Sequence, residues 1–142
     1  YGVGKSTAAR VLREKFDAKI FPIADALRFE LITCGILSKE EAFSKPTSGR
    51  IREILNAYGQ AKKKEEGEYY WISKWLDLIH QHSPCKTIIV DDLRFICEYQ
   101  YIINKVDKNP LIIWVGNFDE ELDETFDLEF LKTKCSYSMQ YL

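Results

Sequence analysis

The first seven residues have the types and spacing that suit a phosphate-binding loop. They read Y-G-V-G-K-S-T, which matches the second half of the pattern G-x-x-x-x-G-K-[ST]. Glycines in such a loop let successive backbone N–H groups turn toward phosphate oxygens, and the following helix adds the partial positive charge of its N-terminus. Lys5 would reach the terminal phosphates, and the hydroxyl of Ser6 would bind Mg²⁺. We therefore predict that ATP and Mg²⁺ bind at Gly2, Gly4, Lys5, Ser6 and Thr7.

This pattern is incomplete, because its first glycine would fall before residue 1 and the chain does not begin with Met. We expect an N-terminal truncation that also removed the strand leading into the loop. A chance glycine-rich turn before a helix is the alternative. Against that alternative, the next residues carry the apolar stripe of an amphipathic helix, formed by Ala8, Ala9, Val11, Leu12 and Phe16.

A second group of chemically useful residues follows a β-branched run. Residues 86–92 read K-T-I-I-V-D-D, as expected of a strand buried on both faces of a parallel sheet. Ligands of such sheets bind beyond the carboxyl ends of the strands, where Asp91 and Asp92 would hold Mg²⁺. Arg94 would bind a phosphate through two parallel hydrogen bonds. The alternatives are that Asp92 only caps the turn into the next helix and that Arg94 pairs with Glu98.

Charge is distributed unevenly along the chain. The formal net charge is -2, yet residues 50–64 hold five basic residues and one acid, whereas residues 116–130 hold seven acids and no Lys or Arg. Arg50 and Arg52 lie near the start of a predicted helix, where backbone N–H groups already favour anions. We predict that this pair binds a phosphate of the donor or the acceptor, with a solvated basic face as the alternative. The mild overall acidity argues against bulk binding of nucleic acid.

The elements that must position these residues alternate between helices and strands. Besides the helix after the loop, helical patterns cover residues 25–34, 50–64, 68–82 and 95–106, with at most one helical turn at 40–43. Strand patterns cover residues 19–24, 86–92 and 111–115. This alternation predicts an α/β fold, namely a three-layer P-loop NTPase fold with a parallel sheet, whose N-terminal strand is missing from the chain.

Size and composition suit one domain that spans residues 1–142, with 46% hydrophobic and 30% charged residues. The four cysteines form no C-x-x-C pair, so we expect reduced thiols. No apolar run approaches the roughly 20 residues that cross a bilayer, and no leader pattern is present, so the cytoplasm is the default location and no membrane partner is expected. The oligomeric state stays open, and a homodimer is compatible with the sequence.

Three segments together resemble a known family. They are the loop remnant G-V-G-K-S-T, the run R-I-R-E-I-L-N-A-Y-G-Q followed by E-Y-Y-W-I, and I-I-V-D-D-L-R-F-I-C-E. In this combination the chain resembles the phage-type deoxynucleoside monophosphate kinases, which are relatives of adenylate kinase. The segment A-D-A-L-R, at residues 24–28, also looks like the segment that follows the second strand in that family.

The resemblance implies transfer of the γ-phosphoryl group of ATP to a deoxynucleoside 5′-monophosphate, with Mg²⁺ and by in-line attack of the acceptor phosphate. No general base is needed, because the acceptor phosphate is already ionised. The residues implied in catalysis are Lys5, Arg52 and Arg94. The substrate-binding candidates are Asp25, Arg28, Arg50, Arg52 and Arg94.

The chain also departs from the family pattern. Such families commonly place arginines in a lid after the fourth strand, but no Arg follows Arg94, and residues 119–129 are acidic. Either the catalytic arginines come from elsewhere, or the C-terminal part has diverged, or the chain is cut short there as well. Two other functions therefore stay open: a small-molecule kinase that resembles animal phosphomevalonate kinase, and a catalytically silent nucleotide-binding module.

Overall fold

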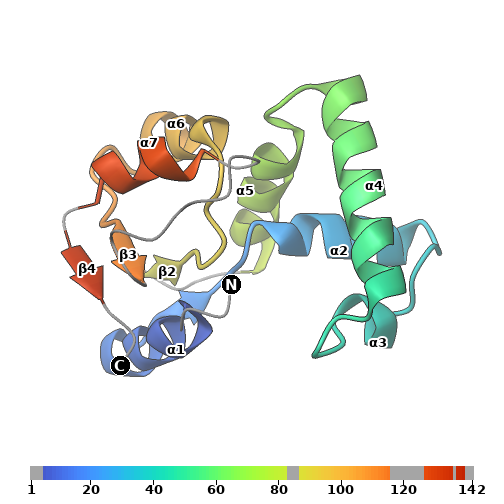
Figure 1. Cartoon of the computed structure of the whole chain (residues 1–142), viewed down its shortest axis with the longest axis horizontal. Coiled ribbons are helices and arrows are strands. Elements are labelled where there is room, and N and C mark those ends of the chain that lie inside the picture. The colour runs from blue at the N-terminus through green and yellow to red at the C-terminus, as the bar shows by residue number, and fades with distance from the viewer. Residues whose placement is uncertain (1–4, 83–86, 116–126, 136, 140–142) are drawn as a thin grey trace. The chain divides into compact units, whose positions relative to one another are not determined.

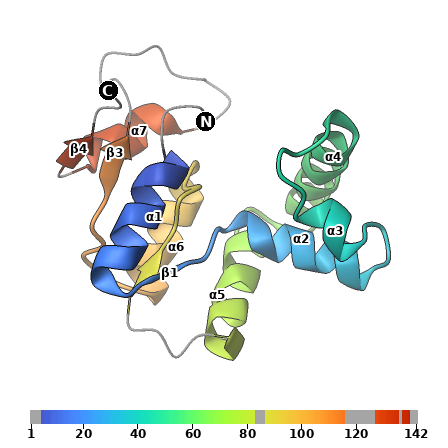
Figure 2. The same ribbon diagram turned by 90° about the horizontal axis from the view of Figure 1, so that it is seen from below.

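The computed structural model describes residues 5–82, 87–115, 127–135 and 137–139. Backbone contacts divide the chain into two compact units. The strand unit contains residues 1–22 and 84–142, and the helical unit contains residues 23–83. Each unit is built around its own set of elements, which Figures 1 and 2 label between them.

The helical unit consists of α2 (Ala24–Thr33), α3 (Lys39–Ala42), α4 (Gly49–Glu66) and α5 (Tyr70–His82). Figure 1 shows α4 as the longest ribbon of this unit, and Figure 2 shows the same helix nearly end-on. The helical predictions for this part of the sequence, including the single turn before α4, are confirmed to within about two residues at each end. Apolar residues with helical spacing therefore located these helices correctly.

Two glycines end helices in this unit. Gly35 follows α2 with φ 76°, and its N–H donates to the carbonyl oxygen of Ile32 at 3.0 Å. Gly67 follows α4 with φ 108°. Both values lie in the region that residues with a Cβ adopt only with strain, so a glycine lets the chain leave each helix without that cost.

The core of the helical unit lies where α2, α3 and α4 pack together. Leu31 is completely buried and packs with Leu37, Ala42 and Ile51, each only 3% exposed. Tyr58 and five aliphatic or aromatic neighbours that are partly buried extend this cluster. On α5, Ile72 and Trp75 are buried to 1% and 2% exposure. Burial of this kind is the main term that favours folding of the unit.

The strand unit begins with α1 (Lys5–Phe16), which leads into β1 (Lys19–Ile20). β1 pairs in parallel with β2 (Ile88–Ile89), with Lys19 opposite Ile88 and Ile20 opposite Ile89. Backbone hydrogen bonds extend this pairing by one residue on each side, from Lys19 to Thr87 and from Phe21 to Ile89. Two chain segments far apart in sequence are thereby joined.

The rest of the strand unit follows β2. It contains α6 (Ile96–Lys105), β3 (Ile113–Val115), α7 (Leu128–Thr133) and β4 (Tyr137–Met139). β3 and β4 form a second parallel pair, which is separate from the first. Helices α6 and α7 lie side by side in Figure 1, and an edge-to-face contact between the rings of Tyr99 and Phe130, 5.8 Å apart, joins them.

The predicted three-layer P-loop NTPase fold with a parallel sheet is wrong. Within the described ranges the chain is mostly helical, and its strands of two or three residues form two separate two-stranded sheets. The strand patterns marked where β1, β2 and β3 lie, but β propensity reflects packing on a pleated surface and does not supply the neighbouring strands. Ile88 and Ile89 are half-buried, whereas a central parallel strand is buried on both faces.

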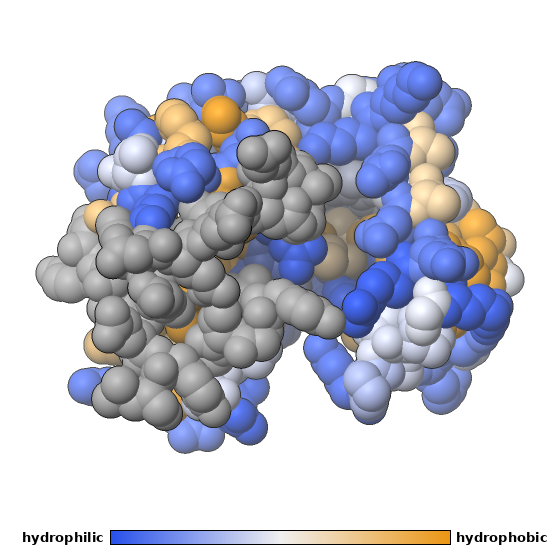
Figure 3. Space-filling view, viewed as in Figure 1, coloured by the Kyte–Doolittle hydropathy of each residue, from blue (hydrophilic) through white to orange (hydrophobic). Residues whose placement is uncertain are grey.

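Hydrophilic residues dominate the surface of the helical unit that Figure 3 shows, with a smaller apolar area at its margin. Exposed large apolar residues of this unit include Phe29, Ile36 and Tyr69. Among the helices that the structure describes, none combines the length and the apolar character needed to cross a membrane.

Candidate functional site

The predicted ATP-binding segment ends in α1. Gly2 and Gly4 lie outside the described residues, and Lys5 is the first residue of the helix. Ser6 and Thr7 are exposed in its first turn, which contains no acidic residue. Backbone N–H groups in the first turn of an α-helix have no partner within the helix, so this end of α1 carries partial positive charge.

The residues predicted at the end of β2 lie in the stretch that joins β2 to α6. Asp91, Asp92 and Arg94 are all half-buried there. The carboxylate of Glu98 was the alternative partner of Arg94, and its Oε1 accepts a hydrogen bond from the backbone N–H of Arg94 at 2.9 Å. It also accepts one from the N–H of Phe95 at 3.0 Å, so Glu98 caps the start of α6.

In the helical unit, Asp25 and Arg28 are brought together on α2. Nη1 of Arg28 lies 3.4 Å from Oδ1 of Asp25, and Nε donates to the carbonyl oxygen of Ala42 at 3.1 Å. The guanidinium carbon also lies 6.0 Å from the centre of the Phe43 ring. Arg28 is thus held against α3, and about a fifth of its side chain is exposed, at 19%.

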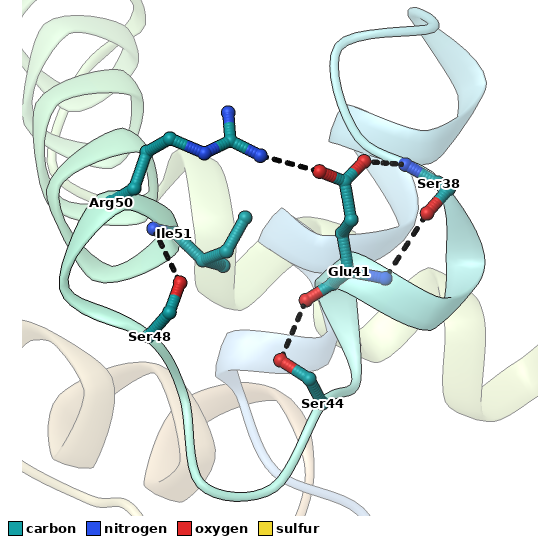
Figure 4. Close-up of polar contacts among 6 residues, drawn as sticks. All are labelled: Ser38, Glu41, Ser44, Ser48, Arg50 and Ile51. Carbon is teal, nitrogen blue, oxygen red and sulfur yellow. Dashed lines mark hydrogen bonds and ion pairs between the residues drawn. The ribbon is translucent and has the colours of Figure 1, made fainter.

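Arg50 has a different partner from the predicted phosphate. Its Nη2 lies 2.5 Å from Oε2 of Glu41, while Oε1 of Glu41 accepts the N–H of Ser38 at 3.0 Å (Figure 4). The two side chains are 66% and 39% exposed, so solvent screens their attraction and the ion pair is weak. Arg52, two residues further along α4, is exposed. A phosphate would have to compete with Glu41 for Arg50.

One largely enclosed charged group of the helical unit is a residue that the sequence analysis did not single out. The side chain of Glu30, on α2, is 11% exposed. Its Oε1 accepts the hydroxyl of Tyr70 at 2.5 Å and the ammonium of Lys74 at 2.8 Å, both from α5. Among the described residues, buried Oε2 has no hydrogen-bond partner. Glu30 therefore ties α2 to α5 through a network that is satisfied on one oxygen only.

These contacts shift the pKa values of Glu30 and of the residues around it. Burial alone would raise the pKa of Glu30, but the hydrogen bonds from Lys74 and Tyr70, together with the nearby Tyr58 hydroxyl, outweigh it and lower the pKa below its ordinary value. The bond to Glu30 raises the pKa of Lys74 and, as its largest cause, the pKa of Tyr58. Glu30 and Lys74 are therefore both charged at neutral pH, which suits an ion pair that holds two helices together.

The predicted site residues thus form four groups. The strand unit holds the start of α1 and, separately along the chain, the Asp91–Arg94 stretch, while the helical unit holds Asp25 with Arg28 and the start of α4. Among the described residues, no three His, Cys, Asp or Glu side chains gather as a metal site. The predicted Mg²⁺ ligands Ser6, Asp91 and Asp92 remain a prediction.

Sequence reasoning overlooked Glu30 and Asp127, although each had a signal. Glu30 lies between Leu27 and Leu31 on the apolar side of its helix, where an acid needs a partner. Asp127 directly precedes α7, the position that favours a capping side chain.

No family model, curated protein or solved structure matches this chain. The residues and their contacts are therefore the basis for the function proposed below.

Proposed function

We propose that this protein is a cytoplasmic phosphotransferase that moves the γ-phosphoryl group of ATP to a small-molecule acceptor, a deoxynucleoside 5′-monophosphate, with Mg²⁺. One observation carries the proposal: the run G-V-G-K-S-T leads directly into α1, which begins at Lys5. A glycine-rich segment that precedes a helix N-terminus without acids, followed by Lys and a hydroxyl, is the sequence arrangement that binds nucleotide phosphates.

The proposed roles follow from the charge of the reaction. Lys5 would bind the terminal phosphates, Ser6 would bind Mg²⁺ directly, and the carboxylates of Asp91 and Asp92 would hold the ion or its waters. Arg94 would bind the transferred group through two parallel hydrogen bonds, which a guanidinium makes more specifically than an ammonium. Phosphoryl transfer needs positioning and charge neutralisation more than covalent help from the protein.

The helical unit would supply the acceptor site. The candidates there for an acceptor phosphate are Arg28, together with Asp25, and the basic start of α4 with Arg50 and Arg52, although a phosphate would compete with Glu41 for Arg50. The resemblance of residues 24–28 to the phage-type kinases favours a nucleoside monophosphate. The proposal depends on the loop and these side chains and not on a three-layer sheet.

The test is an assay of ADP formation with ATP, Mg²⁺ and each deoxynucleoside monophosphate in turn, with phosphomevalonate as a further acceptor. It is run on residues 1–142 and on the complete natural reading frame that contains them. Lys5→Ala should abolish turnover, while Lys15→Ala, which removes an exposed ammonium from the other end of the same helix, should leave it unchanged.

Turnover that depends on one nucleotide and is lost in Lys5→Ala only would support the proposal and identify the substrate. Turnover with phosphomevalonate alone would show that the acceptor is a small molecule other than a nucleotide. ATP binding without turnover on any acceptor would instead favour the silent module, which the absence of arginine after Arg94 also favours.

A further inference from the structure

The main chain at Arg94 is held on both sides by residues that carry carboxylates. Glu98 accepts the N–H of Arg94 from within α6, as described above. From the other side, the N–H of Asp127 donates to the carbonyl oxygen of Arg94 at 2.9 Å. Oδ2 of Asp127 also accepts the N–H of Ile96 at 2.7 Å. Both backbone polar groups of Arg94 are therefore bonded, and so is the N–H two residues later.

Asp127 is itself held in place. Its carbonyl oxygen accepts the N–H of Leu131 at 3.1 Å, so the residue begins the first turn of α7. Leu131 is 4% exposed and anchors that helix in the core. The ring contact between Tyr99 and Phe130 fixes α7 against α6 a turn further along. The Asp127 carboxylate therefore reaches Ile96, 31 residues away in sequence, from a well-packed element.

The charge of Asp127 is also used locally. The first N–H groups of a helix lack partners within the helix and carry partial positive charge, which a carboxylate stabilises. Asp127 provides this carboxylate to the start of α6 from another helix, and Glu98 provides a second from within α6. The Asp127 carboxylate therefore faces a backbone N–H group at the start of α6.

We propose that Asp127 is a positioning residue for Arg94: it fixes the main chain from which the Arg94 side chain reaches the transferred phosphoryl group. This inference rests on the proposed function, in which Arg94 binds that group. A guanidinium that makes two parallel hydrogen bonds needs a backbone held in a fixed position, because a small displacement breaks both bonds. Asp127 fixes this main chain from the residue directly before α7, a helix that contributes no residue to the proposed site.

Two substitutions separate the hydrogen bond from the charge. Asp127→Ala removes the acceptor of the Ile96 N–H, whereas Asp127→Asn keeps an acceptor oxygen and removes the charge. We expect Asp127→Ala to lower kcat about 10-fold with little change in the KM for ATP, since misplacing a group by about 1 Å costs up to roughly 100-fold. Asp127→Asn should stay within about threefold of the wild type, because the acceptor remains. Glu129→Ala, an exposed acid of the same helix, is the matched control.

A double-mutant cycle distinguishes positioning from general support of the fold. If Asp127 acts through Arg94, Asp127→Ala should have no further effect on kcat in an Arg94→Ala background. An equal fall in both backgrounds, or an unchanged kcat in Asp127→Ala, overturns the proposal.

Amide hydrogen exchange gives a readout that does not depend on activity. In Asp127→Ala the N–H of Ile96 should exchange faster than in wild type, while Glu129→Ala should leave it unchanged. If the wild type shows no ATP-dependent turnover with any acceptor, the proposed function fails. Hydrogen exchange then tests only whether Asp127 fixes the Arg94 segment. Faster exchange of the Ile96 N–H in Asp127→Ala would support that role, and unchanged exchange would contradict it.

Discussion

The two units of this protein are held together in different ways. The helical unit packs four helices around buried side chains, with Leu31 at its centre and the carboxylate of Glu30 bonded to two residues of α5. The strand unit joins distant segments mainly through the main chain, by short parallel pairs and by the bonds of Asp127 to the Arg94–Ile96 segment. Side-chain packing dominates one unit, and backbone hydrogen bonds connect the parts of the other.

This difference affects which substitutions matter in each unit. Where packing dominates, a substitution lowers the free energy of unfolding in proportion to the apolar volume that it removes. Where backbone bonds dominate, most side chains near the bond can change, and only the few that accept or donate are sensitive. The helical unit therefore provides a stable platform for its basic residues, whereas the placement of Arg94 depends on two carboxylates.

The largest expected effect tests the packing side of the comparison. Leu31→Ala should lower the free energy of unfolding by about 2–5 kcal/mol, since it leaves a cavity in a completely buried cluster. Denaturant unfolding followed by tryptophan fluorescence measures it, because Trp71 and Trp75 lie in the same unit. Leu111→Ala makes the same deletion at a residue that is 67% exposed and should cost under about 0.5 kcal/mol. Equal losses in the two variants would contradict the packing account.

The next effect concerns Glu30, a charged group of the helical unit whose side chain is largely enclosed. Glu30→Gln should lower the free energy of unfolding at pH 7 by about 1–2 kcal/mol, because Lys74 loses its counter-charge in a partly solvated pair. Glu65→Gln, at an exposed position of α4, is the control and should have almost no effect.

The pH dependence of that effect has a definite sign. The folded-state pKa of Glu30 lies below the ordinary value of 4.5. The contribution of the charged carboxylate to the free energy of unfolding is therefore fully present above pH 4.5 and is lost as the pH falls through the folded-state pKa. The difference between wild type and Glu30→Gln should therefore shrink below about pH 4.5. Unfolding curves collected from neutral to acidic pH measure it, and a difference that grows on acidification would show that the pKa of Glu30 is raised instead.

The same contrast explains what the sequence could predict. Helices depend on contacts between residues three or four apart, so the apolar stripes placed α2, α4 and α5 correctly. A strand depends on a partner elsewhere in the chain. The run at 86–92 therefore predicted a long buried strand, whereas β2 covers Ile88–Ile89 among the described residues of that run. For the site, residue types identified candidate ligands, but the partners Glu41 and Asp127 became visible only once distant segments were placed together.

The smallest expected effect tests whether helix ends in the helical unit are fixed locally. Oγ of Ser48 accepts the N–H of Ile51 at 3.3 Å and caps α4, so Ser48→Ala should lower the free energy of unfolding by about 1 kcal/mol. Ser44→Ala, in the same connection, removes a hydroxyl that only donates to the carbonyl oxygen of Glu41 (Figure 4) and should cost about half as much or less. Thermal unfolding of the two variants measures the difference. If Ser44→Ala were the more damaging, the connection before α4 would be stabilised through α3, and the start of α4, where Arg50 and Arg52 lie, would depend on that contact more than on its own cap.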